Sequence, residues 1–441
     1  MSSRTVAGFY VLFASIGVLI LAWLMPPFQN PDEPNHMYRA DQISHFDLLV
    51  EKLPDGEHGG WIEAGIPQAN APFAKIRFDE TRKVTRPMYA PRPWGPRIPV
   101  GFPNTGLYPP TFYIPAAMAI SLARLMHLTV LHGLLAARLF DGIVSIAVGG
   151  IGIALADAAA PWLFALLLLP MSLSLTAAVS QDGLLFACAA LASSLCSRLR
   201  QPAGGASWIA AAMALALVGM ARPPYAAVSL VLLAMRLPWR RRLYAFAIAV
   251  IPAIAWSALC APHVVTPVFP GGRVDPATQL RFLLHGPWHI IRLVYTTLRV
   301  SGLWLLHGFI GLPGWLDVNL PEPYHLAAWI MLGVAAWISF GASDIRNASI
   351  IGLSGVAIAA LAVFLLLYLT WSLPGAAVID GVQGRYFIPL AIMLAASRAP
   401  GNHAPAGEAG GIFRPLYWSV VVFPIVSITV LTHAIAIRYY P

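Results

Sequence analysis

The chain has 441 residues, of which 58% are hydrophobic and only 11% carry a formal charge. Because a soluble globular domain contains roughly 25% charged residues, this composition excludes an ordinary soluble protein. The apolar runs approach the roughly 20 residues that a membrane-crossing helix needs, and they lack the short alternating pattern of a membrane β-barrel. The sequence therefore predicts an all-α, polytopic integral membrane protein.

The net charge of +9 does not indicate a nucleic-acid partner. Most arginines lie at the ends of apolar runs, where they orient a membrane protein, and no basic stripe is interleaved with aromatic residues. Cys188, Cys196 and Cys260 all lie inside apolar runs and are expected to be small core residues without disulfides. The twelve histidines show no pair at metal-ligand spacing, so no histidine metal site is predicted.

The N-terminal part of the chain combines one apolar run with a long polar segment. The run Val6–Met25 lacks a small-residue cleavage pattern at its end, so we expect an uncleaved first membrane span. The polar segment that follows, residues 26–107, carries ten of the nineteen acidic residues and all three lysines. We interpret it as an ordered but irregular external loop that covers a functional site.

Basic residues set the expected orientation in the membrane. Arg4 and the short basic loop Arg236–Arg242 should be cytoplasmic, because cytoplasmic loops are enriched in arginine and lysine. The spans alternate correctly only if Tyr108–His127 is an interfacial helix that follows the first loop, and not a crossing. A second external segment, residues 261–323, is expected to hold another interfacial or re-entrant helix at Trp288–Leu306.

The expected architecture is a single transmembrane domain over residues 1–441, with about eleven spans, a cytoplasmic N-terminus and an external C-terminus. The spans are predicted at Val6–Met25, Leu134–Ala156, Pro161–Val179, Gly183–Ser197, Ser207–Met220, Pro224–Met235, Leu243–Cys260, Tyr324–Phe340, Ile350–Trp371, Tyr386–Ala396 and Leu416–Ile437. Near the external end of the second span, Arg138 and Asp141 lie three residues apart, and their pairing would lower the cost of placing each in the membrane.

The stretch Asn30–Arg39 directly follows the first span and is the strongest candidate for chemistry. Asp32, His36 and Arg39 are spaced i, i+4 and i+7, which puts them on one face of a helix that starts here. One interpretation is an interfacial helix that is capped by Asp32 or Glu33. The other is a pair of carboxylates held at the membrane surface for proton chemistry. The local sequence leaves both interpretations open.

Further polar groups are expected at the external ends of the spans. Asp182 is either a ligand for a substrate or a cap of the following helix. Arg222, which stands before two prolines, is either a substrate-binding cation or an interfacial anchor. Arg385 lies between a glycine and two aromatic residues and is a candidate phosphate site, because a guanidinium binds phosphate bidentately. Trp315 and Asp317 either form an aromatic-belt turn or contact the substrate.

Six motifs together resemble a known family over nearly the whole chain. They are Pro31–Ala40, Tyr108–Tyr113, Ser180–Asp182, Arg222–Tyr225, Gly314–Asp317 and Gln383–Phe387. In this order they resemble the DUF2142 family of bacterial polytopic membrane proteins. That family is in turn similar to the GT-C superfamily of glycosyltransferases, which use polyprenyl-phosphate sugars. Gly183 stands where family members typically have alanine, and Arg222 with Pro223 stands where relatives often have lysine.

The resemblance implies a bacterial inner-membrane enzyme with an acidic catalytic motif in its first external loop. The implied reaction moves a sugar from a polyprenyl-phosphate donor to an envelope glycan, lipid or protein acceptor on the external, periplasmic face. Asp32 is expected to be the general base, and Glu33 is expected to orient the acceptor or to hold a cation such as Arg39 or Arg385. Substrate contacts are expected from His36, Arg39, Tyr108, Asp182, Arg222, Trp315, Asp317, Gln383, Arg385 and Tyr386.

No cofactor is certain from the resemblance. GT-C enzymes differ in their need for a divalent metal, so a Mg or Mn ion at Asp32 and Asp182 stays an open alternative. Two other classes of function also stay open: a lipid-linked sugar flippase or transporter, and a non-catalytic subunit of a polysaccharide assembly complex. Transport would place charged residues deep within spans and break helices near the membrane midplane. The predicted spans are nearly free of charge away from their ends, which favours glycosyl transfer.

Overall fold

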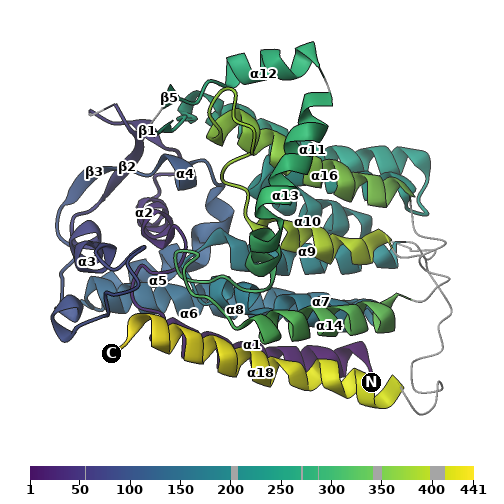
Figure 1. The fold of residues 1–441 in the computed structure, drawn as a ribbon, viewed down its shortest axis with the longest axis horizontal. Helices are drawn as coiled ribbons and strands as arrows, with labels where there is room; N and C mark the ends of the chain where they lie inside the picture. Colours follow the sequence, from purple (N-terminus) through teal and green to yellow (C-terminus); the bar gives the residue numbers. More distant parts are fainter. Residues whose placement is uncertain (55, 200–206, 270–271, 287, 341–349, 398–412) are drawn as a thin grey trace.

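The computed structural model describes the chain except for residues 55, 200–206, 270–271, 287, 341–349 and 398–412. Long helices run side by side in one bundle, and the first loop, which is predicted to be external, packs against one end of that bundle (Figure 1). The helices along the bundle include α1 (Ser3–Leu24), α6 (Val130–Leu155), α7 (Ala160–Leu167), α9 (Gln181–Arg198), α10 (Ser207–Ala221), α11 (Trp239–Cys260), α14 (Glu322–Ser339), α16 (Ile350–Trp371) and α18 (Phe413–Tyr439).

Six helices in the described part of the chain are long and apolar enough to cross a membrane. They are Ser3–Leu24, Val130–Leu155, Trp239–His263, Trp288–Ile310, Ile350–Trp371 and Arg414–Tyr439. The prediction of an all-α, polytopic membrane protein is thereby confirmed at the level of fold class. The number of about eleven spans stays a prediction, because the other predicted spans fall on shorter or less apolar segments.

The predicted span Pro161–Val179 is not one straight helix. It falls on α7 and on α8 (Pro170–Thr176), which form a pair bent by 77°. Pro170 accounts for the break, because proline lacks the N–H that continues a helix and disfavours helical backbone in the residue before it. Leu169 accordingly has ψ 146°. Beyond the bend, Ser174 of α8 donates a hydrogen bond to Asn30 at the end of the first span (Oγ–Oδ1 3.1 Å).

Two further predicted spans are built from tighter helical turns. Residues predicted at Pro224–Met235 form η4 (Pro223–Ala234), a 3₁₀ segment of 12 residues. Residues predicted at Tyr386–Ala396 form η6 (Gly384–Phe387), α17 (Ile388–Met393) and η7 (Leu394–Ser397). A 3₁₀ helix rises about 2.0 Å per residue, so η4 extends about 24 Å, further than an α-helix of the same length.

The first external loop is more regular than the sequence suggested. It contains α2 (Glu33–Ser44), α3 (Gly65–Ala74), η1 (Arg86–Tyr89), α4 (Pro103–Gly106) and an antiparallel sheet of β1 (Glu51–Lys52), β2 (His58–Glu63) and β3 (Arg97–Gly101). The sheet order is β1-β2-β3, with Trp61 opposite Pro99. This small sheet is a local exception to the predicted all-α class.

The segment after this loop is too short to cross a membrane as one helix. It forms η2 (Pro110–Tyr113) and α5 (Ile114–Leu125), which has 12 residues against the roughly 20 that a crossing requires. Ile114, Met118, Leu122 and Leu125 form an exposed apolar stripe at helical spacing along α5. The opposite face packs on α6 and α2. These features agree with the predicted interfacial helix, whose place in a bilayer stays a prediction.

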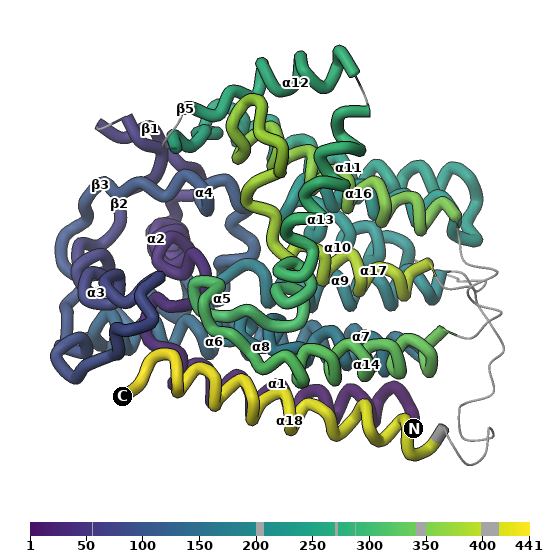
Figure 2. Tube along the Cα trace, viewed as in Figure 1, coloured from purple at the N-terminus to yellow at the C-terminus, as the bar shows by residue number. Residues whose placement is uncertain are grey.

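The second segment that is predicted to be external contains two helices, α12 (Pro276–His285) and α13 (Trp288–Ile310). They follow η5 (Ala261–His263) and the short strands β4 (Val268–Phe269) and β5 (Gly272–Arg273). By length and composition α13 could cross a membrane. Its axis, however, runs across the direction of the bundle helices (Figures 1 and 2). This orientation agrees with the predicted interfacial or re-entrant helix better than with an ordinary span.

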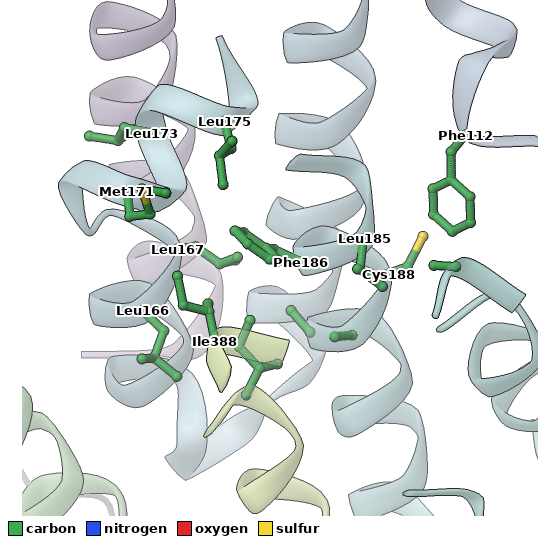
Figure 3. Close-up of a cluster of buried hydrophobic side chains, with 14 of the residues drawn as sticks. Phe112, Leu166, Leu167, Met171, Leu173, Leu175, Leu185, Phe186, Cys188 and Ile388 are labelled. Atoms are coloured by element: carbon green, nitrogen blue, oxygen red, sulfur yellow. The ribbon is translucent and has the colours of Figure 1, made fainter. Parts of the chain in front are cut away.

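The core lies where α9 packs against α7, α8 and α17. Figure 3 shows Phe186 of α9 among Leu167, Leu175 and Ile388, and all four side chains are buried. Apolar side chains therefore fix α9 on three sides. This packing holds the first turn of α9, which carries Asp182, in a fixed position at the loop end of the bundle.

The last helix returns the chain to the first external loop. Lys83 Nζ donates hydrogen bonds to the carbonyl oxygens of Ile437 (2.7 Å) and Arg438 (2.9 Å) at the end of α18. The Tyr440 hydroxyl donates to the carbonyl oxygen of Leu24, the last residue of α1 (2.8 Å). Because both helices end beside the same loop, α1 and α18 run in the same direction (Figure 1).

Candidate active site

Four charged residues from distant segments meet beside the start of α2. Asp32 precedes α2, Asp182 lies in the first turn of α9, Arg222 precedes η4, and Arg385 lies in η6. Arg385 bridges the two acids, with Nη2 3.5 Å from Asp32 Oδ2 and Nη1 3.8 Å from Asp182 Oδ2. Arg222 Nη2 lies 2.9 Å from Asp182 Oδ1. We refer to these four residues as the Asp32 site.

Asp32 is the exposed carboxylate of this site. Its side chain is 36% exposed, whereas that of Asp182 is 4% exposed. Asp32 occupies the N-cap position of α2, but its side chain makes no capping hydrogen bond. The capping interpretation is therefore wrong for Asp32. Its oxygens instead receive Arg385 and the side-chain amide of Asn104 (Nδ2–Oδ1 3.4 Å).

The two arginines retain unused hydrogen-bond donors. Arg385 is buried, and its Nε and Nη1 have no hydrogen-bond partner. The Nε of Arg222 is also buried and has no hydrogen-bond partner. A buried donor without a partner is costly, and a guanidinium fork matches the oxygens of a phosphate. The site is therefore suited to receive an anion beside Asp32.

Aromatic rings cover the two guanidinium groups. The ring of Tyr386 lies 4.2 Å from Arg222 Cζ and 5.6 Å from Arg385 Cζ, and the ring of Tyr108 lies 6.0 Å from Arg222 Cζ. Such contacts stabilise a cation over a ring face. The Tyr225 hydroxyl donates to the Tyr386 carbonyl oxygen (2.7 Å) and so fixes the backbone of η6. Tyr108 and Tyr386 therefore adjoin the Asp32 site, and their contact with a substrate stays a prediction.

His36 adjoins the site from α2. Its ring stacks 6.0 Å from that of Tyr108, and its Nδ1 lies 2.7 Å from the Tyr113 hydroxyl. Burial lowers the pKa of His36 to about 4, although Asp32 and Asp182 act in the opposite direction. We therefore expect His36 to be neutral at physiological pH and to support Tyr108 and Tyr113 without serving as a charged acid.

Comparison with known sequences places the chain in a family. The sequence profile of DUF2142, described as a predicted membrane protein, matches residues 15–394. The chain belongs to the DUF2142 family. No curated protein and no solved structure matches it. All four residues of the Asp32 site lie within the region that matches DUF2142.

Glu33, the second acid of the motif in this DUF2142 protein, is buried in an ion pair. Arg138 of α6 binds it through two hydrogen bonds, Nε–Oε1 at 2.8 Å and Nη2–Oε2 at 2.6 Å. The remaining donors of Arg138 reach the carbonyl oxygens of Ala22, Met25 and Pro26 at the end of α1. Glu33 is fully buried. Glu33 therefore holds a cation, which is one of its two expected roles, but that cation is Arg138 and not Arg39 or Arg385.

The predicted pairing of Arg138 with Asp141 is wrong. Arg138 pairs with Glu33, because the carbonyl groups at the end of α1 complete a full set of acceptors there. Asp141 is a buried acid of α6, and its Oδ1 has no hydrogen-bond partner. Ser180, and not Asp182, caps α9, since its hydroxyl oxygen accepts the Asp182 N–H (3.1 Å).

Three other predicted contact residues make their described contacts outside the Asp32 site. Arg39 donates to Gln42 and to the carbonyl oxygens of Leu48 and Tyr108, so it anchors the loop. Asp317 pairs with Arg438 (Oδ2–Nη2 2.6 Å). Trp315 donates to the Phe28 carbonyl oxygen (3.1 Å) and stacks under Arg77, which lies 4.4 Å from its ring.

Gln383 directly precedes η6, two residues before Arg385. Its Oε1 is buried and has no hydrogen-bond partner. An unpaired buried acceptor next to the site is consistent with the predicted substrate contact, which stays a prediction. The residues that sequence reasoning missed are the supporting ones: Asn104, Tyr113, Tyr225 and Arg77. Tyr113 and Tyr225 lie within two of the six motifs but were not singled out there, whereas Asn104 and Arg77 lie outside all six.

A separate cluster in the first loop already contains its own cation. Asp41, His45 and Glu63 place ligand atoms within 4.8 Å of one another, the only such group among the described residues. Arg124 of α5 lies between them, with Nη1 3.0 Å from Glu63 Oε1 and 3.6 Å from Asp41 Oδ1. The guanidinium thus occupies the position that a metal ion would require. We interpret the cluster as a clamp that holds α5 to the loop.

Gly384 allows Arg385 to reach the site. A Cβ atom at Gly384 would overlap the Leu305 carbonyl oxygen and the Phe309 amide nitrogen of α13. We therefore expect Gly384→Ala to destabilise the protein by about 1–3 kcal/mol, the usual effect of overpacking, and to displace Arg385. The measurement is thermal unfolding in detergent.

The matched control is Gly302→Ala in α13, the helix that Gly384 approaches, because a Cβ at Gly302 would meet nothing within 4 Å. Alanine favours a helix over glycine, so this variant should melt at or above the wild-type temperature. Equal melting of the two variants would show that the close approach of η6 to α13 is not required.

Proposed function

We propose that the protein is a glycosyltransferase that moves a sugar from a polyprenyl-phosphate donor to an acceptor hydroxyl on the external face of the membrane. The observation that carries this proposal is the Asp32 site itself. An exposed carboxylate stands 3.5 Å from a buried arginine that has unused N–H donors. A base beside an anion-binding cation is what transfer from a phosphate leaving group requires.

In the proposed reaction, Asp32 takes the proton from the acceptor hydroxyl as its oxygen attacks the anomeric carbon. The bond between that carbon and the phosphate oxygen breaks, and its electron pair leaves with the polyprenyl phosphate. Arg385, with Arg222 beside it, stabilises the charge that the phosphate gains. Asp182 holds both arginines in place through its two oxygens. The acceptor is an envelope glycan, lipid or protein hydroxyl.

No metal ion is needed to complete this charge arrangement. Arg385 lies between Asp32 and Asp182, where a Mg or Mn ion bound by both acids would have to lie. A divalent ion would therefore compete with Arg385 for the same oxygens. We propose that the arginines supply the positive charge, so transfer should persist in the presence of a chelator.

The proposed orientation follows the basic residues. Arg198 donates to the Leu155 carbonyl oxygen at the end of the bundle opposite to Asp32, and Ser3 bonds to the neighbouring Ala154. With this end in the cytoplasm of a bacterial inner membrane, the Asp32 site faces the periplasm. The lipid donor would then reach the site from the outer leaflet.

One observation favours the alternative of a lipid-linked sugar transporter. Transporters contain broken helices, and α7 and α8 form a pair bent by 77°. The residues at that break are Leu168, Leu169 and Pro170, all apolar and buried. Since a transport site for a polar sugar needs polar ligands at the break, the bend supports this alternative less strongly than the Asp32 site supports transfer.

The test is a transfer assay on the purified full-length protein. It is incubated with radiolabelled polyprenyl-phosphate sugars and cell-envelope acceptors, with and without chelator. We expect label in the acceptor fraction and little effect of the chelator. Movement of intact donor across vesicle membranes without transfer would identify a transporter. Loss of transfer with chelator, restored by Mg or Mn, would overturn the arginine-based mechanism.

A further inference from the structure

A groove of about 600 Å³ opens at the outer end of α18, away from the Asp32 site. It lies between α18, the turn after α3 and the segment that leads into α14. Its lining residues are Glu80, Lys83, Asp317, Asn319, Pro321, Thr429, Val430, His433, Ala434, Ile437 and Arg438. We call it the α18 groove. Its volume is within the 300–1,000 Å³ of typical small-ligand pockets.

The position of the groove along α18 corresponds to the outer boundary of a bilayer. The helix has 27 residues, or about 40 Å at 1.5 Å per residue, which exceeds a hydrocarbon core of about 30 Å. The excess is expected at its last turns, because these bond to Lys83 of the loop that we propose to lie outside the membrane. From Thr429 to Arg438 the groove follows α18 for about 14 Å. It thus extends from the acyl region into the headgroup region.

Apolar and charged residues are separated along this length. Val430 and Ala434 line the deeper part, whereas Lys83, Arg438 and Asp317 lie at or beyond the end of the helix. Arg438 and Asp317 satisfy each other through two hydrogen bonds, 2.9 Å and 2.6 Å long. They therefore contribute no free charge to a ligand.

Two charged side chains of the groove stay available to a ligand, the cation Lys83 and the anion Glu80. Lys83 binds two backbone carbonyl oxygens and makes no ion pair among the described residues, so its ammonium charge is not neutralised. Glu80 is exposed at the rim, three residues earlier in the same turn. A zwitterionic headgroup above acyl chains complements this arrangement, because its phosphate fits Lys83 and its ammonium fits Glu80.

We propose that the α18 groove is a binding site for a phosphatidylethanolamine-type phospholipid of the outer leaflet. The phosphate contacts Lys83, the ammonium group contacts Glu80, and the first part of an acyl chain lies along Val430 and Ala434. This site is distinct from the Asp32 site and does not depend on the proposed transfer reaction.

Native mass spectrometry of the full-length protein tests this proposal. The protein is released from detergent that contains equal amounts of phosphatidylethanolamine and phosphatidylglycerol. We expect at least a threefold excess of bound phosphatidylethanolamine, about what one partly exposed ion pair provides. Glu80→Gln should remove this preference, and Ala434→Trp, which fills the groove, should lower the retention of both lipids.

The matched control is Glu51→Gln, which removes an exposed acid of β1 and does not line the groove. It should retain the wild-type preference. Equal retention of the two lipids by the wild type would mean general annular lipid only and would overturn the proposal. A preference for phosphatidylglycerol, or an identical preference in Glu80→Gln and wild type, would overturn it as well.

Discussion

Replacing Asp32 by asparagine should abolish glycosyl transfer and leave the protein folded. Asp32 adopts φ 58° and ψ 10°, and asparagine, like aspartate, tolerates this left-handed backbone. The variant keeps the shape of the side chain and loses only the charge and the basicity. Because a general base contributes about 10²–10⁴-fold, the transfer rate should fall by a hundredfold or more. The rate is measured with the radiolabelled donor in membranes.

Two comparisons make this result specific to the base. Protein amount and melting temperature in detergent should stay near wild type, since Asp182 continues to hold Arg385. The matched control is Asp380→Asn, which changes an exposed acid five residues before Arg385 and should keep full activity. Transfer by Asp32→Asn at more than about a tenth of the wild-type rate would contradict the assignment of the base.

Replacing Arg138 by methionine should prevent stable folding. Its five donors serve Glu33 and three carbonyl oxygens at the end of α1, and both side chains are buried. Removing one partner of a buried ion pair costs about 3–5 kcal/mol, a large part of the 5–15 kcal/mol that holds a typical protein together. We expect little folded protein after detergent extraction, as measured by size-exclusion chromatography.

The exposed pair of Arg198 and Asp157 is the matched control for this prediction. Its side chains are 47% and 63% exposed, so Arg198→Gln should cost less than about 1 kcal/mol. Adding Glu33→Leu to the Arg138→Met variant should recover part of the folded fraction, because it removes the unpaired buried charge of Glu33. Normal folding of Arg138→Met would show that the motif does not depend on this pair.

The sequence was sufficient for the fold class and for four residues of the site. Apolar runs identify membrane helices whatever their packing. When the predicted spans alternate in direction, the short motifs at their ends fall on the same predicted face of the membrane. Asp32, Asp182, Arg222 and Arg385 were all found in this way, and the structure joins them through ion pairs.

The partners of the buried charges could not be predicted in the same way. Arg138 has an acid three residues away in Asp141, yet it binds Glu33, which is 105 positions distant. Only the folded chain shows that the end of α1 offers three carbonyl groups to the same guanidinium. The division between an exposed Asp32 and a buried Glu33 likewise depends on what packs against α2, which local spacing does not encode.

The break in the third predicted span and the 3₁₀ geometry of the sixth also depend on packing. Prolines at 170 and 223 mark both places, but a proline alone does not distinguish a kink, a break and a helix start. In the structure, the elements that pack around each proline determine which of these forms it takes. One example is α16, which packs along η4.

The common direction of α1 and α18 limits the number of times the chain can cross the membrane. Both helices are long and apolar enough to span it, and both end beside the first loop, where Tyr440 bonds to Leu24. A chain whose first and last spans run in the same direction crosses an odd number of times. Six crossings are thereby excluded. Seven result if the bent pair α7 and α8 counts as one span and α13 is counted as a crossing. If α13 is interfacial, as its direction favours, α1, α6, α11, α16, α18 and the bent pair give six crossings, and an odd number of the elements α9, α10, η4, α14 and α17 must cross as well.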